Sequence, residues 1–460
     1  MIRECYRDSF VLTRANVKTD FIPIVSSVTN LFAIFAKAIL FCKTSIPKEK
    51  HYYSSYLKEK HFGLCLLLLI PIVGNILFCA LNLLASKKVR SLTLEKKNIP
   101  SLQTWAKLGN ADAMNLLGRC YGKEQGQQNK ATYWYLQAAV RGHANAMNCL
   151  AVCYENGRGV GKDLQKAIAL YRQAVKGGNS IAMNNLAICY EKGTGVERDL
   201  KQAAALYRQA ATLGDPDGLY NLGKCYEYGY GVEKNVEEAV KLYRQAADLG
   251  LPRAMNRLAL CYDEGRGVGK NIQKAIALYR QAVNAGNHSA MYNLGICYEQ
   301  GDGVDKDRKG AVELYHQAAT LGLPIAMNRL ALIYEEGRGV EKDIQKAITL
   351  YRQAVKGGNS IAMNNLAICY EKGTGVEIDL KQAAALYRQA ATLGDPDGLY
   401  NSGNCYEHGV GVEQDLIKAA QLYQKAADKG HPKAKKALEK VQLKLNRNGW
   451  EDLSDQRDLA

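Results

Sequence analysis

Proline is scarce in this sequence, and its few histidines are scattered. Nine prolines against 42 glycines in 460 residues exclude a proline-rich linker protein. No two of the seven histidines stand four residues apart, and none accompanies a pair of cysteines at the spacing of a zinc site. The pattern therefore predicts no metal site and no cofactor.

Acidic residues are fewer than basic ones, which argues against an acidic tail or a mimic of an acidic substrate. The chain has 61 Lys and Arg and 45 Asp and Glu, and residues 1–98 alone carry 15 against 6. A hydrophobic content of 47% excludes wholesale disorder. Because the basic charge lies mainly beside apolar segments in the first fifth of the chain, we expect it to face anionic lipid headgroups and expect no nucleic-acid partner.

The chain repeats itself from about residue 107 to residue 430. A tyrosine recurs after a first step of 33 residues and then at steps of 36, and a second tyrosine series follows the same course. The first series is Tyr121, Tyr154, Tyr190, Tyr226, Tyr262, Tyr298, Tyr334, Tyr370 and Tyr406. Nine units fit this pattern, and the first is three residues short in its inner loop, so its turn should be atypical.

A cysteine stands directly before the repeat tyrosine in eight of the nine units. These residues are Cys120, Cys153, Cys189, Cys225, Cys261, Cys297, Cys369 and Cys405. Equivalent positions in stacked helical repeats lie about 9–10 Å apart, which is beyond the reach of a disulfide. Ile333 replaces the cysteine in the remaining unit, so we expect buried thiols that act as small apolar side chains in a reducing compartment.

Each unit is predicted to form two antiparallel helices. In the unit at 179–214, apolar residues fall at helical spacing within 180–192 and again within 199–212. Gly193 can end the first helix in a left-handed conformation, and Asp199 can cap the second. Pro216 can open the first helix of the next unit. A pair this small cannot bury both of its faces alone, so neighbouring units should stack into a solenoid.

The unit resembles the Sel-1-like repeat (SLR), a relative of the tetratricopeptide repeat. Its pattern is A-x-x-x-L-[GA]-x-x-Y-x-x-G-x-G-V-x-x-D-x-x-K/Q-A-x-x-L-Y-x-x-A-A-x-x-G, which covers about 330 residues. The resemblance implies an all-α, right-handed superhelical solenoid of about nine 36-residue helix-turn-helix repeats, used as a protein–protein interaction scaffold. Members of the family serve as adaptors in membrane-associated complexes and as host-interacting proteins of intracellular bacteria.

Two stretches of the array are almost identical, because residues 166–227 and 346–407 differ at only four positions. Near-identical units suit repeated weak contacts and argue against one unique catalytic constellation, so we expect no enzyme and no catalytic residue. The alternative is a β-lactam-binding, hydrolase-like SLR protein. Those relatives carry two cysteines and a disulfide within each repeat, whereas these repeats mostly carry one cysteine and lack an S-x-x-K nucleophile signature.

Two apolar segments precede the repeats. Residues 62–85 are 24 consecutive uncharged residues, enough to span a bilayer of about 30 Å, and residues 21–42 are a weaker candidate that contains Lys37. They predict a hydrophobic helical hairpin with both termini on the cytoplasmic side, since its flanks are more basic than the loop 43–61. The pair loosely resembles the membrane-anchoring lobe of bacterial proteins inserted into host vacuolar membranes. The alternative is a soluble adaptor in which these segments form a buried cap.

A ladder of asparagine and tyrosine stands six residues before the first tyrosine series. In the tetratricopeptide pattern this position faces the concave groove, where Asn can bond to a peptide backbone and Tyr adds area and a hydroxyl. We predict that the ladder binds the partner; the alternative is that its asparagines cap or bridge neighbouring helices. The members are Asn115, Asn148, Asn184, Tyr220, Asn256, Tyr292, Asn328, Asn364 and Tyr400.

A second polar ladder is formed by the carboxylate that follows the repeat tyrosine. Its members are Glu155, Glu191, Glu227, Asp263, Glu299, Glu335, Glu371 and Glu407. Recurrence every 36 residues makes a row and not an acid–base pair. We interpret the row as a solvated acidic edge, or alternatively as a stripe that meets a basic partner.

The predicted organisation has three parts. Residues 1–98 form a basic region with the apolar segments 21–42 and 62–85, residues 99–431 form the nine repeats, and residues 432–460 form a capping helix (432–446) and a loose tail. The expected partners are a protein or peptide of unknown identity and a membrane, through residues 21–85. The repeats should face a reducing, cytosolic compartment; a soluble cytoplasmic protein, or one secreted into a host cell, is the alternative.

Overall fold

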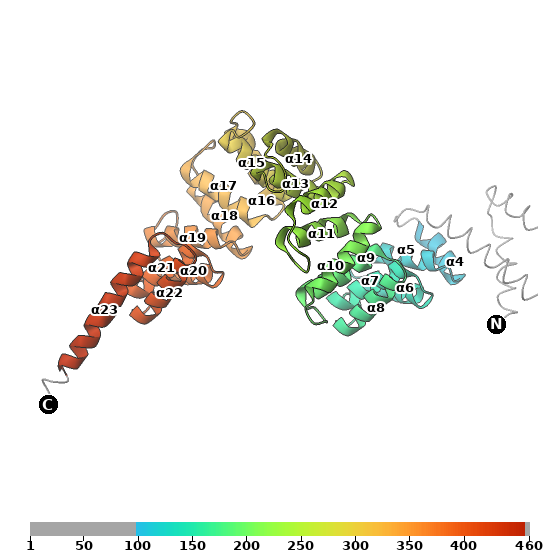
Figure 1. Cartoon of the computed structure of the whole chain (residues 1–460), viewed down its shortest axis with the longest axis horizontal. Helices are drawn as coiled ribbons and strands as arrows, with labels where there is room; N and C mark the ends of the chain where they lie inside the picture. The colour runs from blue at the N-terminus through green and yellow to red at the C-terminus, as the bar shows by residue number, and fades with distance from the viewer. Residues whose placement is uncertain (1–97, 456–460) are drawn as a thin grey trace, which may run out of the picture. The chain divides into compact units, whose positions relative to one another are not determined.

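The computed structural model describes residues 98–455, and that part of the chain is all-helical. Figure 1 shows the helices following one another in pairs, with α4 (Ile99–Lys107) before the first pair and α23 (Ala434–Asp455) after the last. The fold predicted for residues 99–431 is thereby confirmed as an array of nine stacked helix pairs. The predicted hairpin of segments 21–42 and 62–85 lies outside the described residues.

Each repeat contains two helices, called the first helix and the second helix in chain order. The first helices are α5 (Ala111–Gly122), α7 (Ala144–Asn156), α9 (Ser180–Lys192), α11 (Pro216–Tyr228), α13 (Pro252–Glu264), α15 (His288–Gln300), α17 (Pro324–Glu336), α19 (Ser360–Lys372) and α21 (Pro396–His408). The second helices are α6 (Gln128–Val140), α8 (Leu164–Lys176), α10 (Leu200–Thr212), α12 (Val236–Asp248), α14 (Ile272–Asn284), α16 (Arg308–Thr320), α18 (Ile344–Lys356), α20 (Leu380–Thr392) and α22 (Leu416–Asp428).

Local capping determines where these helices begin and end. Gly193 takes the left-handed conformation (φ 71°) directly after α9, which is open to glycine without strain. The Asp199 side chain accepts a hydrogen bond from the Gln202 N–H at 2.9 Å and so caps α10. Asp215 caps α11 in the same way, and Pro216 opens that helix. The capping roles predicted for Gly193, Asp199 and Pro216 are confirmed.

The loop within each repeat packs against the repeat before it. Val196 lies against the apolar cluster that contains Ile168 of α8. The second loop glycine permits a closer approach still: a Cβ on Gly231 would stand 1.9 Å from the Leu200 carbonyl oxygen, and its φ is 70°. Glycine is therefore required there by both space and backbone conformation.

The core is built from the second tyrosine series and small alanines. The rings of Tyr207, Tyr243 and Tyr279 are fully buried between the two helices of their own repeat and the next repeat. Three residues further along each second helix stands an alanine without accessible surface, such as Ala210 or Ala246. The small side chain allows close helix–helix packing, and each buried ring contributes about 2 kcal/mol.

Each second helix packs on the first helix of the next repeat, and among equivalent helices of successive repeats the first helices approach each other more closely than the second helices do. Five pairs of first helices pack directly on one another: α7 with α9, α9 with α11, α13 with α15, α17 with α19, and α19 with α21. The second helices of successive repeats do not pack on one another to this extent. The first helices therefore form the inner side of the array within residues 111–431.

The two ends of the array depart from the regular repeat. The short inner loop of the first repeat lacks the left-handed glycine after its first helix, since α5 is followed by Lys123 in a right-handed conformation. At the other end, α23 buries Ala434 and Val441 and thereby covers the last pair. This helix continues to Asp455 through residues expected to form a loose tail, because no proline interrupts it and Gly449 alone is only mildly unfavourable in a helix. Within residues 98–455, no helix combines the length and the apolar character needed to cross a bilayer.

Candidate functional site

The predicted Asn/Tyr ladder lies on the inner side of the array, but much of it is covered. Five of its members are buried: Asn115, Asn148, Asn184, Asn328 and Asn364. The other four, Asn256, Tyr220, Tyr292 and Tyr400, are half-buried. The ladder therefore lies largely within the packing between first helices, and its contact with a partner stays a prediction.

Four of the six ladder asparagines accept hydrogen bonds from an asparagine of the next first helix. Asn221 donates from Nδ2 to the Asn184 Oδ1 at 2.7 Å, which joins α11 to α9. Three equivalent bonds of 3.0 Å join Asn185 to Asn148, Asn293 to Asn256, and Asn365 to Asn328. These amides therefore bridge neighbouring helices, as the second of the two sequence interpretations describes.

The ladder tyrosines occur together with a glycine three residues later. The Tyr220 ring lies 5.5 Å from the ring of Tyr243, and a Cβ on Gly223 would stand 2.6 Å from the Tyr243 Cε1. The repeats with Tyr292 and Tyr400 have the same arrangement, with Gly295 and Gly403. Most repeats with an asparagine in the ladder have alanine at this position instead, whereas the first repeat combines Asn115 with Gly118. The other eight repeats thus fall into two classes, Asn/Ala and Tyr/Gly.

Each carboxylate that follows the repeat tyrosine accepts a hydrogen bond from a core tyrosine. The Tyr243 hydroxyl donates to the Glu227 Oε2 at 2.7 Å, and the same bond recurs in the repeats from residue 144 to residue 431. Burial and this hydrogen bond raise the pKa of Tyr243 well above its ordinary value, so the phenol remains a donor. The carboxylates are therefore held inside the scaffold, which neither sequence interpretation of the row included.

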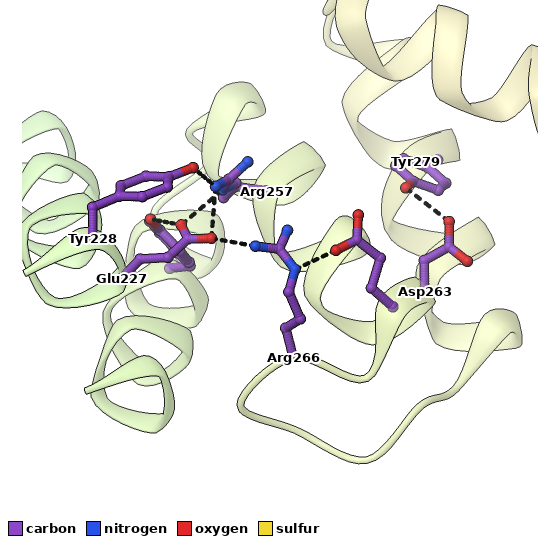
Figure 2. Close-up of polar contacts among 8 residues, drawn as sticks. Glu227, Tyr228, Arg257, Asp263, Arg266 and Tyr279 are labelled. Carbon is purple, nitrogen blue, oxygen red and sulfur yellow. Dashed lines mark hydrogen bonds and ion pairs between the residues drawn. The ribbon is translucent and has the colours of Figure 1, made fainter. Parts of the chain in front are cut away.

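In the Tyr/Gly repeats this carboxylate also forms ion pairs with basic side chains of the following repeat or, after the last repeat, of the capping helix α23. Figure 2 shows Glu227 between Arg257 and Arg266, both from the following repeat. The Arg257 Nε and Nη2 lie 2.9 and 2.6 Å from the two carboxylate oxygens, and the Arg266 Nη1 lies 2.7 Å from Oε1. Glu227 itself is only 3% exposed. We name this arrangement the carboxylate clamp.

The clamp recurs at the other two Tyr/Gly repeats and is weaker or missing elsewhere. Arg329 and Arg338 hold Glu299, and Lys444 of α23 holds Glu407 at 2.7 Å. Asp263 of an Asn/Ala repeat, shown beside the clamp in Figure 2, forms only a 3.4 Å hydrogen bond with Tyr279. The distribution of clamps therefore follows the class of repeat.

The class of repeat also determines how closely the first helices approach. Four of the five closely packed pairs of first helices are joined by an Asn–Asn bond. In contrast, α11 and α13, and likewise α15 and α17, pack less directly, and there Arg257 and Arg329 occupy the position of the bridging asparagine. An arginine is long enough to reach the carboxylate across the wider junction.

The side chains that do face outward from the first helices stand one residue after the predicted ladder. In α9 they are Ile181, Asn185, Ile188 and Lys192, which share one helix face and are half-buried or exposed. We name the equivalent residues of all first helices the open stripe; among them only Asn221 is buried. Its most exposed apolar members are Ile181 and Ile361, at 53% and 48%. The helix face predicted for the ladder is correct only approximately, because one residue corresponds to a rotation of about 100° around the helix axis.

The open stripe carries an aliphatic row that sequence analysis missed. Two residues before the repeat tyrosine stand Val152, Ile188, Leu260, Ile296, Leu332 and Ile368. Each packs with one side against the core and leaves the other side partly accessible. The signal in the sequence is an apolar residue at a fixed register. A buried core position has the same pattern, so periodicity alone does not distinguish an accessible apolar row from a core row.

The cysteines behave as predicted within the described residues. Seven of the eight register cysteines are buried, Cys153 is half-buried, and Ile333 is buried at the same position. Burial raises the pKa of Cys189 to about 12 and that of Cys225 to about 11, so both thiols are protonated. Within residues 98–455, no three His, Cys, Asp or Glu side chains gather closely enough to hold a metal ion.

Two solved structures of repeat proteins are similar to this chain. The protective antigen c5321 of uropathogenic Escherichia coli, which displays an SLR fold, is 26% identical; the match covers 75% of this chain and 91% of that one, with a TM-score of 0.48. A Sel1 repeat protein from Oxalobacter formigenes is 28% identical, with 65% and 87% covered and a TM-score of 0.47. No curated protein sequence matches the chain significantly.

The Sel1 repeat profile matches the chain nine times in succession, from residue 111 to residue 431. Its matches at 180–215 and 216–251 begin with the first residues of α9 and α11, so the matched units coincide with the helix pairs. The matches cover more than half of the 460 residues, and the chain belongs to the Sel1 repeat family.

Proposed function

We propose that the array is a scaffold that binds a protein partner along the open stripe of its first helices. The observation that carries this proposal is the recurrence of the stripe: an accessible aliphatic side chain stands at the same register in six of the nine repeats, with Lys224 between Ile188 and Leu260, and polar and charged side chains flank the row. Apolar contacts supply affinity, and the flanking polar groups supply specificity. Sel1 and tetratricopeptide-like repeat proteins serve as interaction scaffolds, which agrees with this assignment.

The ladder asparagines and tyrosines contribute mainly by supporting the stripe. Asn184 and Asn328 lie beneath it and orient Asn221 and Asn365 of the next repeat through their hydrogen bonds. We infer that direct contact with a partner falls to the stripe, with the half-buried Tyr220, Tyr292 and Tyr400 at its edge. The proposed function involves no catalytic step.

The test replaces two exposed isoleucines of the stripe. Ile181→Glu and Ile361→Glu, combined in the full chain, place charge on the binding surface without opening the core, because both side chains are about half exposed. Proteins captured from the cells that make the chain are then quantified by mass spectrometry. The matched control combines Ile378→Glu and Ile417→Glu, two exposed isoleucines that do not belong to the stripe.

The proposal expects partners to be lost from the stripe variant and kept by the control. Partners that are retained by both variants would show that binding uses another surface. Circular dichroism of both variants confirms that the helices are intact before capture.

We further propose that residues 21–85 anchor the scaffold to a membrane. The support is the uncharged run 62–85 with its basic flanks. The full chain should stay in the membrane fraction after alkaline carbonate extraction, whereas a chain that begins at residue 99 should be soluble. If both are soluble, the chain is a free adaptor.

We also propose that the repeats face a reducing compartment, either the cytosol of the producing cell or that of a host cell. The support is the register of buried, protonated thiols. Protease protection of intact membranes decides the side on which the repeats lie. Protection of the repeats from added protease in vesicles with an exposed cytoplasmic face would contradict this orientation.

A further inference from the structure

A cavity of about 380 Å³ opens where the end of α15 and the start of α16 meet α17 of the next repeat. Its lining includes Gln300 and Arg329, which belong to the open stripe, so a partner bound along the stripe passes over it. Four cations and one carboxylate line the cavity. The charged residues are Glu299, Lys306, Arg308, Arg329 and Arg338.

The single carboxylate of this cavity is already fully engaged. Glu299 accepts hydrogen bonds from the Tyr315 hydroxyl at 2.8 Å and the Arg329 Nε at 3.0 Å, and its Oε1 lies 2.8 Å from the Arg329 Nη2. Arg338 adds a longer contact of 3.4 Å. Lys306 and Arg308 form no ion pair with any carboxylate within the described residues. Two cations therefore face the cavity with their charge uncompensated.

The junction two repeats earlier has the same clamp but a different cover. There Tyr228 replaces Gln300, and its ring lies over Arg257 with centroid and guanidinium 5.5 Å apart. Its hydroxyl accepts a hydrogen bond from Arg257, as Figure 2 shows. Val236 replaces Arg308 at that junction. The ring of Tyr228 thus covers the clamp at Glu227. The clamp at Glu299 has no aromatic cover and has an additional cation beside it, Arg308.

Nearby acidic residues neutralise only part of the charge of the open cavity, since Glu336 pairs with Arg338 and with no other cation of its lining. Asp305 and Asp307 line a separate opening together with Arg280 and not this cavity. Asp307 is engaged as the cap of α16, where it accepts a hydrogen bond from the Gly310 N–H at 2.9 Å. The cavity therefore keeps an excess of positive charge.

We propose that this cavity binds a carboxylate side chain from an acidic segment of the protein partner. The inference rests on the proposed function, since it supplies the chemistry of one contact along the stripe. Arginine and lysine form short, charge-assisted hydrogen bonds with carboxylates, and Lys306 and Arg308 are exposed and therefore accessible to such a group. Gln300 at the rim adds an amide that can donate to the same group.

The test measures binding of a fluorescein-labelled hexaglutamate peptide to the full chain by fluorescence anisotropy, in a non-ionic detergent. Gln300→Tyr copies the covered junction without changing the net charge and should weaken binding at least tenfold. The double variant Lys306→Gln with Arg308→Gln should weaken it by a similar factor. Lys234→Gln removes the lysine equivalent to Lys306 at the covered junction and should change binding less than twofold.

Three results would overturn the assignment. The first is equal binding by the wild-type chain and both cavity variants, and the second is no preference for hexaglutamate over hexaglutamine. The third is saturable binding of inorganic phosphate at this cavity without binding of hexaglutamate, which would assign it to a free anion. The two proposals can fail separately. If the Ile181/Ile361 variant loses its partners but the wild-type chain does not bind hexaglutamate, the scaffold proposal is supported and only the acidic contact is rejected. If the wild-type chain binds hexaglutamate but no partner depends on the stripe, the acidic site is supported and the scaffold proposal is rejected.

Discussion

Residues 166–227 and 346–407 are almost the same sequence placed in two parts of the array. They differ only by Ala169/Thr349, Arg198/Ile378, Leu222/Ser402 and Lys224/Asn404. The helices α9, α10 and α11 of the first segment begin and end at the same register as α19, α20 and α21 of the second. Local sequence is therefore sufficient to define the helices and their caps.

The polar contacts of the two segments nevertheless differ. In the first, Asn221 donates to Asn184. In the second, Asn364, the counterpart of Asn184, donates to the Asp395 Oδ1 at 2.7 Å instead. Glu227 meets two arginines of the next repeat, whereas its counterpart Glu407 meets Lys444 of the capping helix. A repeat thus carries its own helices, but its neighbours decide how its polar groups are used.

The largest difference inside the core is the pair Leu222 and Ser402. Leu222 is 4% exposed and belongs to the apolar core of its repeat. Ser402 is 1% exposed, and its hydroxyl has no hydrogen-bond partner. An unpaired buried hydroxyl costs about 1–3 kcal/mol, and the serine also forgoes the burial of a leucine side chain.

Exchanging these two residues should have the largest effect. Leu222→Ser is expected to destabilise α11 by about 4 kcal/mol, through a cavity and a buried hydroxyl. Ser402→Leu should stabilise α21 by about 1–2 kcal/mol, because the matching surroundings of Leu222 accommodate a leucine. Because repeat arrays can unfold in parts, native-state hydrogen exchange of the two helices is the appropriate measurement. Destabilisation by Ser402→Leu would show that the second site is packed closely around the serine.

The next largest difference is expected between the clamps at Glu227 and Glu407, in the stability lost when the carboxylate is removed. Glu227→Gln leaves Arg257 without its carboxylate and takes from Arg266 one of its two carboxylate partners, since Arg266 also pairs with Glu264, and we expect a loss of about 3 kcal/mol at that junction. Glu407→Gln should cost about 1 kcal/mol, since the Lys444 side chain is 48% exposed and can return to water.

Urea unfolding at low and high salt distinguishes the two clamps. The effect of Glu407→Gln should shrink in 1 M NaCl, whereas that of Glu227→Gln should persist because its ion pairs are better shielded. Adding Arg257→Gln to Glu227→Gln should recover part of the loss, as removal of both partners leaves fewer uncompensated groups. Equal losses at Glu227 and Glu407 would contradict the view that neighbours set the strength of the clamp.

The helices were predictable because their signals are local. The segments expected at 180–192 and 199–212 became α9 (Ser180–Lys192) and α10 (Leu200–Thr212), with Gly193 and Asp199 in the expected roles. Repetition strengthened this prediction, since the same caps recur in consecutive units. The end of α23 was less predictable because no strong breaker follows residue 446.

The binding surface was less predictable because it depends on contacts between repeats. Periodicity located the inner side of the first helices but could not decide between Asn184, which is buried, and Asn185, which is half-buried and belongs to the open stripe. The clamp joins Glu227 to residues 30 and 39 positions later. No local pattern reveals such a contact, and it becomes visible only once the stacking of two repeats is known.

Lys224 and Asn404 offer the smallest and sharpest test of the comparison. The Lys224 Nζ lies 3.9 Å from the Glu191 Oε1, and both side chains are about one-third exposed, so Lys224→Asn should cost no more than about 0.5 kcal/mol. Asn404→Lys should increase the free energy of unfolding by a similar amount, because it creates the equivalent ion pair with Glu371. Both effects should vanish in 1 M NaCl. A double-mutant cycle with Glu191→Gln isolates the pair. A coupling above about 1.5 kcal/mol would mean that this surface pair, and not only the buried clamps, distinguishes the two segments.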